Sequence, residues 1–384
     1  MKSTKILSLL LLSLISTDLL AQNFDIGHST ITFYDSARSR DIETEIYYPA
    51  DNAGDNVPVA LGNYPVLVFG HGFLMSWDAY ENFWTALVPE GYVMCFPTTE
   101  MGLSPNHGDL GLDLSFIAAQ MQREHQDSSS LFFQALLSKT ALMGHSMGGG
   151  ASFLAAENDS AISTLVNFAA AETNPSAIAA AAHVRIPSLI FSGDDDCVTP
   201  PVDHQEPLYD ALASACKTHV SIVNGGHCYF ANNNFSCTLG ETFCNPTLDI
   251  SREAQHDVTF DFLKLWLAYT LYDQTQILST FNDSLGNSTR VTVTQNCNAT
   301  SIQSVEDREA LLLFPNPVTD YLNVRIPQNH PQGLIYIYNT MGQKIYQQTV
   351  DHSSFQINFA EFPKGSYILI YRSESESHVR TILK

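Results

Sequence analysis

The sequence predicts a doubly wound α/β domain built on a mostly parallel sheet, followed by a small all-β sandwich. Two patterns support this prediction. Over residues 22–297, short β-rich runs alternate with longer helical stretches, which is typical of an α/β layer structure. Over residues 311–384 the runs are all β-rich and are separated by Pro and Gly turns. A chain of 384 residues fits two domains of unequal size.

The β-rich runs of the larger domain are short, and several are apolar throughout. Strands that are buried on both faces of a parallel sheet have this composition. The expected strands are residues 42–48, 66–69, 92–96, 141–143, 165–168, 188–191 and 220–223. The expected helices are residues 113–123, 149–156, 206–215 and 251–271.

The pattern changes after residue 271. Residues 273–308 are polar, and we expect a tail of the larger domain that continues into a linker over residues 298–310. Short alternating or apolar runs then return, which predicts a β-sandwich over residues 311–384. The expected strands of this sandwich are residues 322–326, 334–338, 355–359 and 366–371.

Residues 1–21 have the features of an export signal. Lys2 and Lys5 precede an apolar stretch over residues 6–15, and Ala21 ends a plausible cleavage site. The apolar stretch is too short to cross a bilayer, although an uncleaved signal anchor is the alternative. No other segment is long and apolar enough, so we expect a mature protein without a transmembrane segment.

The composition excludes some classes of partner. The chain has 40 acidic and 18 basic residues and a net charge of −22, which argues against nucleic acid and anionic membranes as partners. Solubility outside the cell explains this acidity, and a cationic ligand is the alternative. With 45% hydrophobic and 15% charged residues, the chain can form a sizeable core. We expect a monomer.

The strongest local signal is Gly144-His145-Ser146-Met147-Gly148, which matches the pattern G-x-S-x-G. It follows an apolar run and precedes a small-residue helical stretch, as a strained strand-to-helix turn requires. The glycines leave room for this turn, which exposes the serine hydroxyl. We therefore expect Ser146 to be a nucleophile, and an ordinary Gly-rich turn is the alternative.

A serine nucleophile needs a histidine base and an orienting acid, which follow the serine in the order acid and then histidine. Asp196 ends an aspartate run after the expected strand 188–191, and Asp194 and Asp195 are the alternatives for the acid. A solvated turn or a calcium-binding loop would also explain this run. His227 directly follows the expected strand 220–223 through Asn-Gly-Gly, so we expect it to be the base.

The serine mechanism also needs two backbone N–H groups that stabilise the oxyanion. Met147 follows the nucleophile and supplies the first. Strand 66–69 runs into Gly70-His71-Gly72-Phe73, so we expect the N–H of Phe73 to be the second. A simple turn is the alternative explanation for these glycines.

The chain has seven cysteines. Six of them lie after the middle of the chain, and an exported protein could join them in up to three disulfides, with 15 possible pairings. They are Cys197, Cys216, Cys228, Cys237, Cys244 and Cys297. Cys197 and Cys228 each follow an expected catalytic residue, so we predict a bridge between them and a local bridge between Cys237 and Cys244. We expect Cys95 to be a buried free thiol. A zinc site is the alternative, but no CxxC or HxxxH spacing supports it.

From about residue 25 to 297 the sequence resembles the polyester hydrolase and cutinase-like branch of α/β-hydrolases, which is related to the dienelactone hydrolases. The resemblance rests on the segments 70–73, 144–150, 187–191 with Asp196, and 224–227. It implies a lidless, shallow cleft for bulky or polymeric esters, with no metal or organic cofactor. By the same resemblance, the residues that contact the substrate are Phe73, His145, Met147 and Val198.

The sequence departs from this group in one loop. Polyester hydrolases often carry a Trp that stacks on the polymer's aromatic ring, in the loop after the strand that follows the serine turn. Here residues 170–174 read Ala-Ala-Glu-Thr-Asn and offer no aromatic side chain. We therefore expect hydrolysis of simple esters, with aromatic polyesters such as poly(ethylene terephthalate), or cutin-like esters, as further candidates.

The last 75 or so residues resemble the C-terminal sorting domain of type IX secretion. The resemblance rests on the segments 314–317, 335–339, 341–343 and 364–367 and on a basic end at Arg380 and Lys384. It implies that the type IX machinery exports the chain across both membranes and then releases it or attaches it to the surface. A carbohydrate-binding or adhesive sandwich is the alternative.

Together these features predict a secreted carboxylic ester hydrolase with an acyl-enzyme cycle. Two alternatives remain at this point. One is an amidase or peptidase of the same fold, and the other is a catalytically silent protein that binds a surface polymer.

Overall fold

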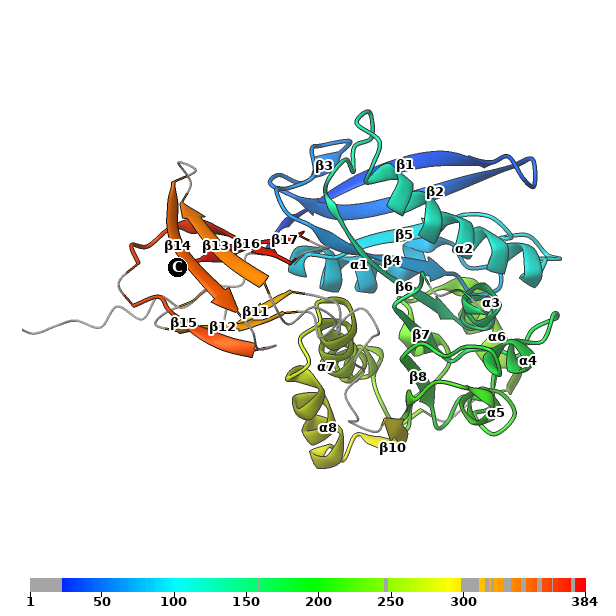
Figure 1. Ribbon diagram of the computed structural model, residues 1–384. Coiled ribbons are helices and arrows are strands. Elements are labelled where there is room, and N and C mark those ends of the chain that lie inside the picture. The colour runs from blue at the N-terminus through cyan, green and yellow to red at the C-terminus, as the bar shows by residue number, and fades with distance from the viewer. Residues whose placement is uncertain are drawn as a thin grey trace, which may run out of the picture. The chain divides into compact units, whose positions relative to one another are not determined.

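The protein divides into two compact units, Met1–Asn298 and Ala299–Lys384 (Figure 1). The computed structural model describes residues 23–157, 159, 161–244 and 248–297. It also describes residues 311–384 apart from 315–317, 319–320, 327–332, 340–342, 351–353, 361 and 374–376. The predicted export signal (1–21) and linker (298–310) lie outside the described residues.

The larger unit is built on a ten-stranded sheet with the order β10-β9-β8-β7-β6-β4-β5-β2-β1-β3. Its central strands are parallel and almost entirely buried, because helices cover both faces. They are β4 (Tyr64–Gly70), β5 (Val93–Pro97), β6 (Leu136–His145), β7 (Thr164–Phe168), β8 (Ser188–Gly193) and β9 (Cys216–Ile222). The outer strands are β1 (Asp25–Asp35), β2 (Arg40–Ala50), the short β3 (Gly54–Asp55) and β10 (Val291–Cys297). Strands β1, β2 and β10 pair in the antiparallel sense.

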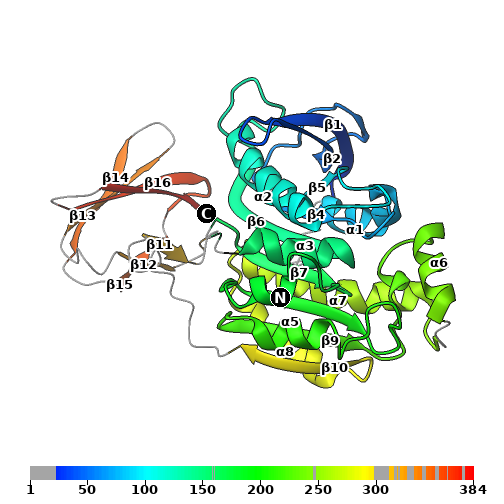
Figure 2. The same cartoon turned by 90° about the vertical axis from the view of Figure 1, so that its right-hand side faces the viewer.

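Two apolar clusters bind helices to the two faces of this sheet (Figure 2). One face carries α2 (His107–Glu124), α3 (Met147–Ala156), α4 (Ala177–Ala181) and α5 (Gln205–Ala211). The other carries α1 (Glu81–Leu87), α7 (Arg252–Leu271) and α8 (Ile277–Asn287). This arrangement confirms the predicted doubly wound α/β fold. None of the helices in the described part of the chain is both long and apolar enough to span a bilayer.

Residues 273–297 are more ordered than their polar composition predicts. Helix α8 buries Phe281 and Leu285 against the core beside α7, and Leu278 also packs there, while most of its remaining positions are polar. Strand β10 then extends the sheet beside β9, and a disulfide joins Cys216 to Cys297. The expected tail of the larger domain is therefore one helix and one edge strand.

The smaller unit is a β-sandwich, as predicted. One sheet has the order β11-β12-β15 and the other β14-β13-β16-β17. Their strands are β11 (Leu312–Phe314), β12 (Tyr321–Arg325), β13 (Gly333–Asn339), β14 (Lys344–Val350), β15 (Ser354–Asn358), β16 (Ser366–Arg372) and β17 (Ser377–Leu383). Apolar residues of both sheets, such as Val324 and Leu369, share one core.

Candidate active site

Ser146 lies in the sharp turn between β6 and α3. Its backbone has φ 55° and ψ −120°, a conformation that residues other than glycine rarely adopt. The turn packs tightly on the end of β4, because a Cβ atom on Gly148 would lie 2.2 Å from the carbonyl group of Gly70. Only glycine fits there. This packing holds Ser146 at the carboxyl end of the central strand, with its side chain partly exposed.

Asp196 and His227 lie in direct contact. Oδ2 of Asp196 is 2.8 Å from Nδ1 of His227, and both side chains are buried. The carboxylate also accepts hydrogen bonds from the N–H groups of Val198 and Thr199, each at 2.8 Å. An aspartate held in this way keeps the proton of His227 on Nδ1 and leaves Nε2 as a base.

Thr199 was not identified from the sequence, although it contacts both members of this pair. Its hydroxyl Oγ1 is 2.8 Å from Oδ2 of Asp196 and 3.0 Å from Nδ1 of His227. Gln205 reaches the same hydroxyl at 3.3 Å. A Thr three residues after an Asp is a recurrent local hydrogen-bonding pattern, and this spacing is the signal that could have identified it.

Polar side chains, two of them buried, hold the loop that carries His227 on both sides of that residue. Gln255 of α7 donates to the carbonyl of Gly226 and accepts from its N–H, both at 2.9 Å. Glu241 accepts from the N–H of Cys228 at 2.8 Å. Arg252 donates to the carbonyls of Cys228 and Ala231. These bonds fix the main chain on which the imidazole is mounted.

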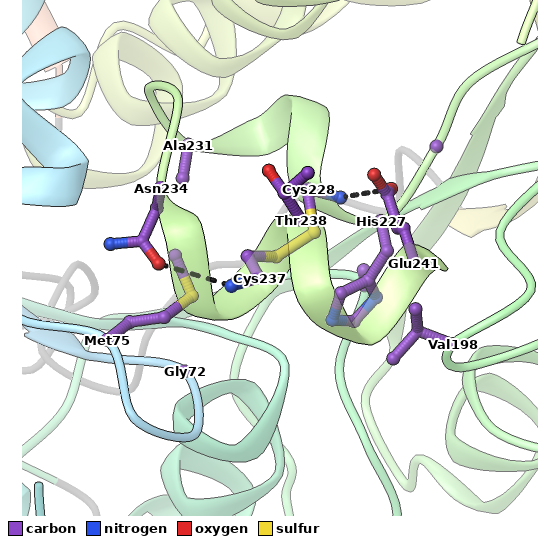
Figure 3. Close-up of a disulfide and its surroundings, with 12 residues drawn as sticks. Gly72, Met75, Val198, His227, Cys228, Ala231, Asn234, Cys237, Thr238 and Glu241 are labelled. Atoms are coloured by element: carbon purple, nitrogen blue, oxygen red, sulfur yellow. Dashed lines mark hydrogen bonds between the residues drawn. A yellow bond between two sulfur atoms is a disulfide. The ribbon is translucent and has the colours of Figure 1, made fainter. Parts of the chain in front are cut away.

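Two disulfides join the loops of Asp196 and His227 to α6 (Phe235–Cys244). Figure 3 shows the bridge between Cys228 and Cys237. Cys197 pairs with Cys244, and Cys228 pairs with Cys237. The predicted pairings, Cys197 with Cys228 and Cys237 with Cys244, are therefore wrong. Cys237 and Cys244 lie on one helix about 10 Å apart along its axis, too far for a bridge. Each instead reaches the neighbouring loop. Cys95 is a buried free thiol, as predicted.

The residues expected to contact the substrate differ in exposure. Phe73 is 47% exposed and Val198 is partly exposed, whereas Met147 is 4% exposed. Met147 begins α3, so its N–H has no acceptor within the helix. His145 has no exposed surface, and both of its ring nitrogens are bonded within the protein. The expectation that His145 lines the substrate cleft is therefore not met.

His145, which directly precedes Ser146, packs against His227. The imidazole of His145 lies 4.8 Å from that of His227, measured between ring centres. Within the described residues the hydroxyl of Ser146 and the ring of His227 are not joined by a hydrogen bond. Catalytic hydrogen bonds are often long without substrate and shorten when it binds.

Metal-ligating side chains do not cluster at this site within the described residues. In the parts of the chain described above, no cluster of three or more His, Cys, Asp or Glu side chains could hold a metal ion. One surface cavity of 320 Å³ lies beside the loop after β9, lined among others by Asn224, Asp257 and Arg290. None of the three expected catalytic residues lines it.

Comparison with known proteins identifies the family. A family model described as PET hydrolase-like matches residues 25–244, which is more than half of the chain. The chain belongs to the PET hydrolase-like family. A second model, a secretion system C-terminal sorting domain, matches residues 312–384. The first match supports an ester hydrolase, and the second indicates secretion with attachment at the cell surface. The predicted resemblances are confirmed at this level.

Two characterised relatives match parts of this PET hydrolase-like chain. Cutinase est1 of Thermobifida alba is 31% identical over 114 residues, which cover 29% of this chain and 36% of the cutinase. The funoran endo-beta-hydrolase of Wenyingzhuangia aestuarii is 35% identical over 74 residues, 19% of this chain and 10% of that protein. The chain thus spans about a third of the first relative and a tenth of the second. The cutinase match supports a carboxylic ester hydrolase at the family level.

Proposed function

We propose that this protein is a secreted serine carboxylic ester hydrolase in which Ser146 is the nucleophile, His227 the base and Asp196 the orienting acid. The observation that carries the proposal is the 2.8 Å contact between His227 and Asp196. His227 also packs against His145, with 4.8 Å between the ring centres, and the residue after His145 is Ser146, which has a positive φ at the end of β6. Membership of the PET hydrolase-like family favours ester substrates.

The proposed reaction has two halves. In the first, Oγ of Ser146 attacks the ester carbonyl carbon while Nε2 of His227 takes the hydroxyl proton. The negative charge on the carbonyl oxygen is stabilised by the N–H groups of Phe73 and Met147. The tetrahedral intermediate collapses, and Nε2 gives its proton to the departing alcohol. In the second half, water attacks the acyl carbon and gives a proton to Nε2. The second tetrahedral intermediate then collapses, Nε2 returns this proton to Oγ of Ser146, and the acid is released.

A comparison of esters with anilides tests the reaction type. We expect p-nitrophenyl butyrate to be cleaved with a kcat/KM at least about a hundredfold above that of butyryl p-nitroanilide. The Ser146→Ala variant should lose both activities. Faster cleavage of the anilide would favour the amidase alternative. If folded wild-type protein cleaves neither substrate, the silent polymer-binding alternative is favoured.

An exposed apolar stripe on α6 favours large or insoluble esters as the substrates. The stripe consists of Phe235, Leu239 and Phe243, which are 81%, 46% and 85% exposed. Their spacing of four residues places them on one face of the helix. Exposed apolar patches of this kind mark contact with another apolar surface. The disulfides of Cys228 and Cys197 hold α6 directly beside the loops of His227 and Asp196.

The substrate range can be separated from catalysis with one double variant. Phe235→Ser combined with Phe243→Ser should reduce hydrolysis of an amorphous aliphatic polyester film severalfold and leave p-nitrophenyl butyrate hydrolysis unchanged. Both positions are exposed, so the substitutions should not unfold the protein. A matched control is Leu61→Ser, a 99% exposed leucine outside α6, which should change neither activity. Equal film hydrolysis by wild type and the double variant would contradict a role for this stripe.

A further inference from the structure

Two buried side chains outside the proposed catalytic residues, Tyr80 and His145, form a continuous polar chain beneath the site. The hydroxyl of Tyr80, at the end of the short helix Trp77–Tyr80, accepts from the N–H of Gly72 at 2.8 Å. The same hydroxyl lies 3.0 Å from Nδ1 of His145. Nε2 of His145 lies 3.1 Å from the carbonyl oxygen of His227. Both side chains have no exposed surface.

The partners of His145 fix which of its ring nitrogens donates and which accepts. A carbonyl can only accept, so Nε2 of His145 must carry a proton and donate it to His227. Burial lowers the pKa of His145 well below its usual value, with a further contribution from His227, so the ring is neutral and Nδ1 is an acceptor. The single proton of the Tyr80 hydroxyl faces two acceptors, Nδ1 of His145 at 3.0 Å and the sulfur of Met75 at 3.3 Å. Because a thioether sulfur accepts only weakly, the hydroxyl donates to Nδ1. Burial also raises the pKa of Tyr80, which keeps this proton in place.

The hydrogen-bonded chain of Tyr80 and His145 joins three loops that the proposed reaction requires. Gly72 precedes Phe73, whose N–H is one proposed oxyanion donor, and His145 precedes Ser146. The third loop is that of His227. The fit at Gly72 is close, because a Cβ atom there would lie 3.2 Å from both the Tyr80 hydroxyl and Nδ1 of His145, and 2.7 Å from the sulfur of Met75. Aligned hydrogen bonds of this kind strengthen one another in a buried environment.

We propose that Tyr80, acting through His145, is a positioning residue that holds the oxyanion loop and the His227 main chain in register with Ser146. This inference rests on the proposed function and adds two residues to it. Neither residue touches the reacting atoms. Their effect is to keep the N–H of Phe73 and the imidazole of His227 where the transition state needs them. A displacement of about 1 Å in such groups can cost on the order of a hundredfold in rate.

The test is the Tyr80→Phe variant, which removes one oxygen and leaves the ring in the core. We expect kcat for p-nitrophenyl butyrate to fall about ten- to a hundredfold with KM changed less than about twofold. The inhibition constant of butylboronic acid, a tetrahedral adduct-forming inhibitor, should weaken by a similar factor. Rates are normalised to the fraction of protein that a fluorophosphonate titrates, so unfolded molecules do not contribute.

The matched control is Tyr48→Phe. Tyr48 lies in β2, an outer strand of the sheet, and is also fully buried. Its hydroxyl donates to the carbonyl of Val57 at 2.8 Å. It should lose thermal stability as Tyr80→Phe does, with no change in kcat or in boronate inhibition. If Tyr80→Phe does not fold, His145→Gln and His145→Phe replace it. Glutamine can accept from Tyr80 and donate to His227, so it should retain more activity than phenylalanine.

Two results would overturn the inference. One is a normalised kcat for Tyr80→Phe equal to that of Tyr48→Phe. The other is full additivity of the losses in kcat caused by Tyr80→Phe and His145→Phe. If the two residues act in one hydrogen-bonded chain, the double variant should lose little more kcat than the worse of the two single variants. The Ser146→Ala variant separates this from the proposed function. If Ser146→Ala stays active, the proposed function is wrong, whereas an inactive Ser146→Ala with a fully active Tyr80→Phe rejects only the positioning role.

Discussion

Nδ1 of His227 lies 2.8 Å from Oδ2 of Asp196, although 31 residues separate them in the sequence. The contact follows from the sheet. Strands β8 and β9 are parallel neighbours, so the loops that leave their carboxyl ends meet at the same edge. Ser146 follows the carboxyl end of β6, which lies at the same edge of the sheet, two strands from β8.

Replacing the buried carboxylate should abolish most of the activity without unfolding the protein. Asp196→Asn removes the charge that holds the proton of His227 on Nδ1, so we expect kcat to fall by about 10⁴. The measurement is the steady-state hydrolysis of p-nitrophenyl butyrate. Asp195→Asn is the control, because Asp195 is exposed, and it should retain wild-type activity. Loss in the control and retention in Asp196→Asn would show that the wrong aspartate is proposed.

The hydroxyl of Thr199 should contribute to both stability and rate. Thr199→Val keeps the shape of the side chain and leaves Oδ2 of Asp196 with one hydrogen bond fewer. We expect the free energy of unfolding to fall by about 1–3 kcal/mol. We also expect kcat to fall about three- to tenfold, because a hydrogen bond that orients the base is lost. Thr199→Ser keeps the hydroxyl and should be close to wild type in urea unfolding and in kcat. Equal losses in both variants would argue for methyl packing instead.

Removal of two different disulfides should affect activity and stability differently. The pair Cys228 and Cys237 closes a short loop with a separation of 9, and Cys216 and Cys297 close a long one with a separation of 81. Loop entropy predicts losses of about 2.6 and about 4.5 kcal/mol when each pair is replaced by alanine. Only the first pair adjoins His227, so only its removal should lower kcat. Calorimetry and ester hydrolysis on both double variants provide the check, and a larger loss of activity on removing Cys216 and Cys297 would contradict it.

Acid should destabilise the larger unit through His219. Burial lowers the pKa of His219 to about 4, and its ring lies 2.8 Å from the Ser192 hydroxyl. Between pH 6.5 and 4 the unfolded chain binds the proton that the folded one refuses, so stability is lost as the pH falls. We expect this residue to remove about 2–3 kcal/mol between pH 7 and 4.5. Urea unfolding at both pH values should show a smaller loss for His219→Gln. The same loss in both proteins would exclude His219 as the cause.

The parts of the site that the sequence could predict are those next to buried strands. Ser146, Asp196 and His227 each follow an apolar run, and parallel strands bring such positions to one edge of the sheet. The residues that were missed contact the site from helices. Gln255 and Glu241 hold the His227 loop, and nothing in their local sequence distinguishes them from surface polar residues.

The elements that the sequence did not predict, such as β1 and α8, bury only one of their faces. Strand β1 has no apolar run, because two of its buried positions are the polar Ser29 and Asp35, and α8 buries little beyond Phe281 and Leu285. The disulfide pairing depended on α6, which was not predicted, so Cys237 and Cys244 could not be assigned partners correctly. The resemblance to polyester hydrolases implied that His145 contacts the substrate, yet His145 is buried while the adjacent Ser146 is partly exposed.

The central claim is that Ser146 is activated by His227, and a fluorophosphonate probe tests it most directly. The wild-type protein and the His227→Ala variant are incubated with the probe, digested, and analysed by mass spectrometry. We predict one adduct, on the peptide that contains Ser146, which forms at least about a hundredfold more slowly in His227→Ala. An adduct on another serine, or equal labelling of both proteins at Ser146, would contradict the account.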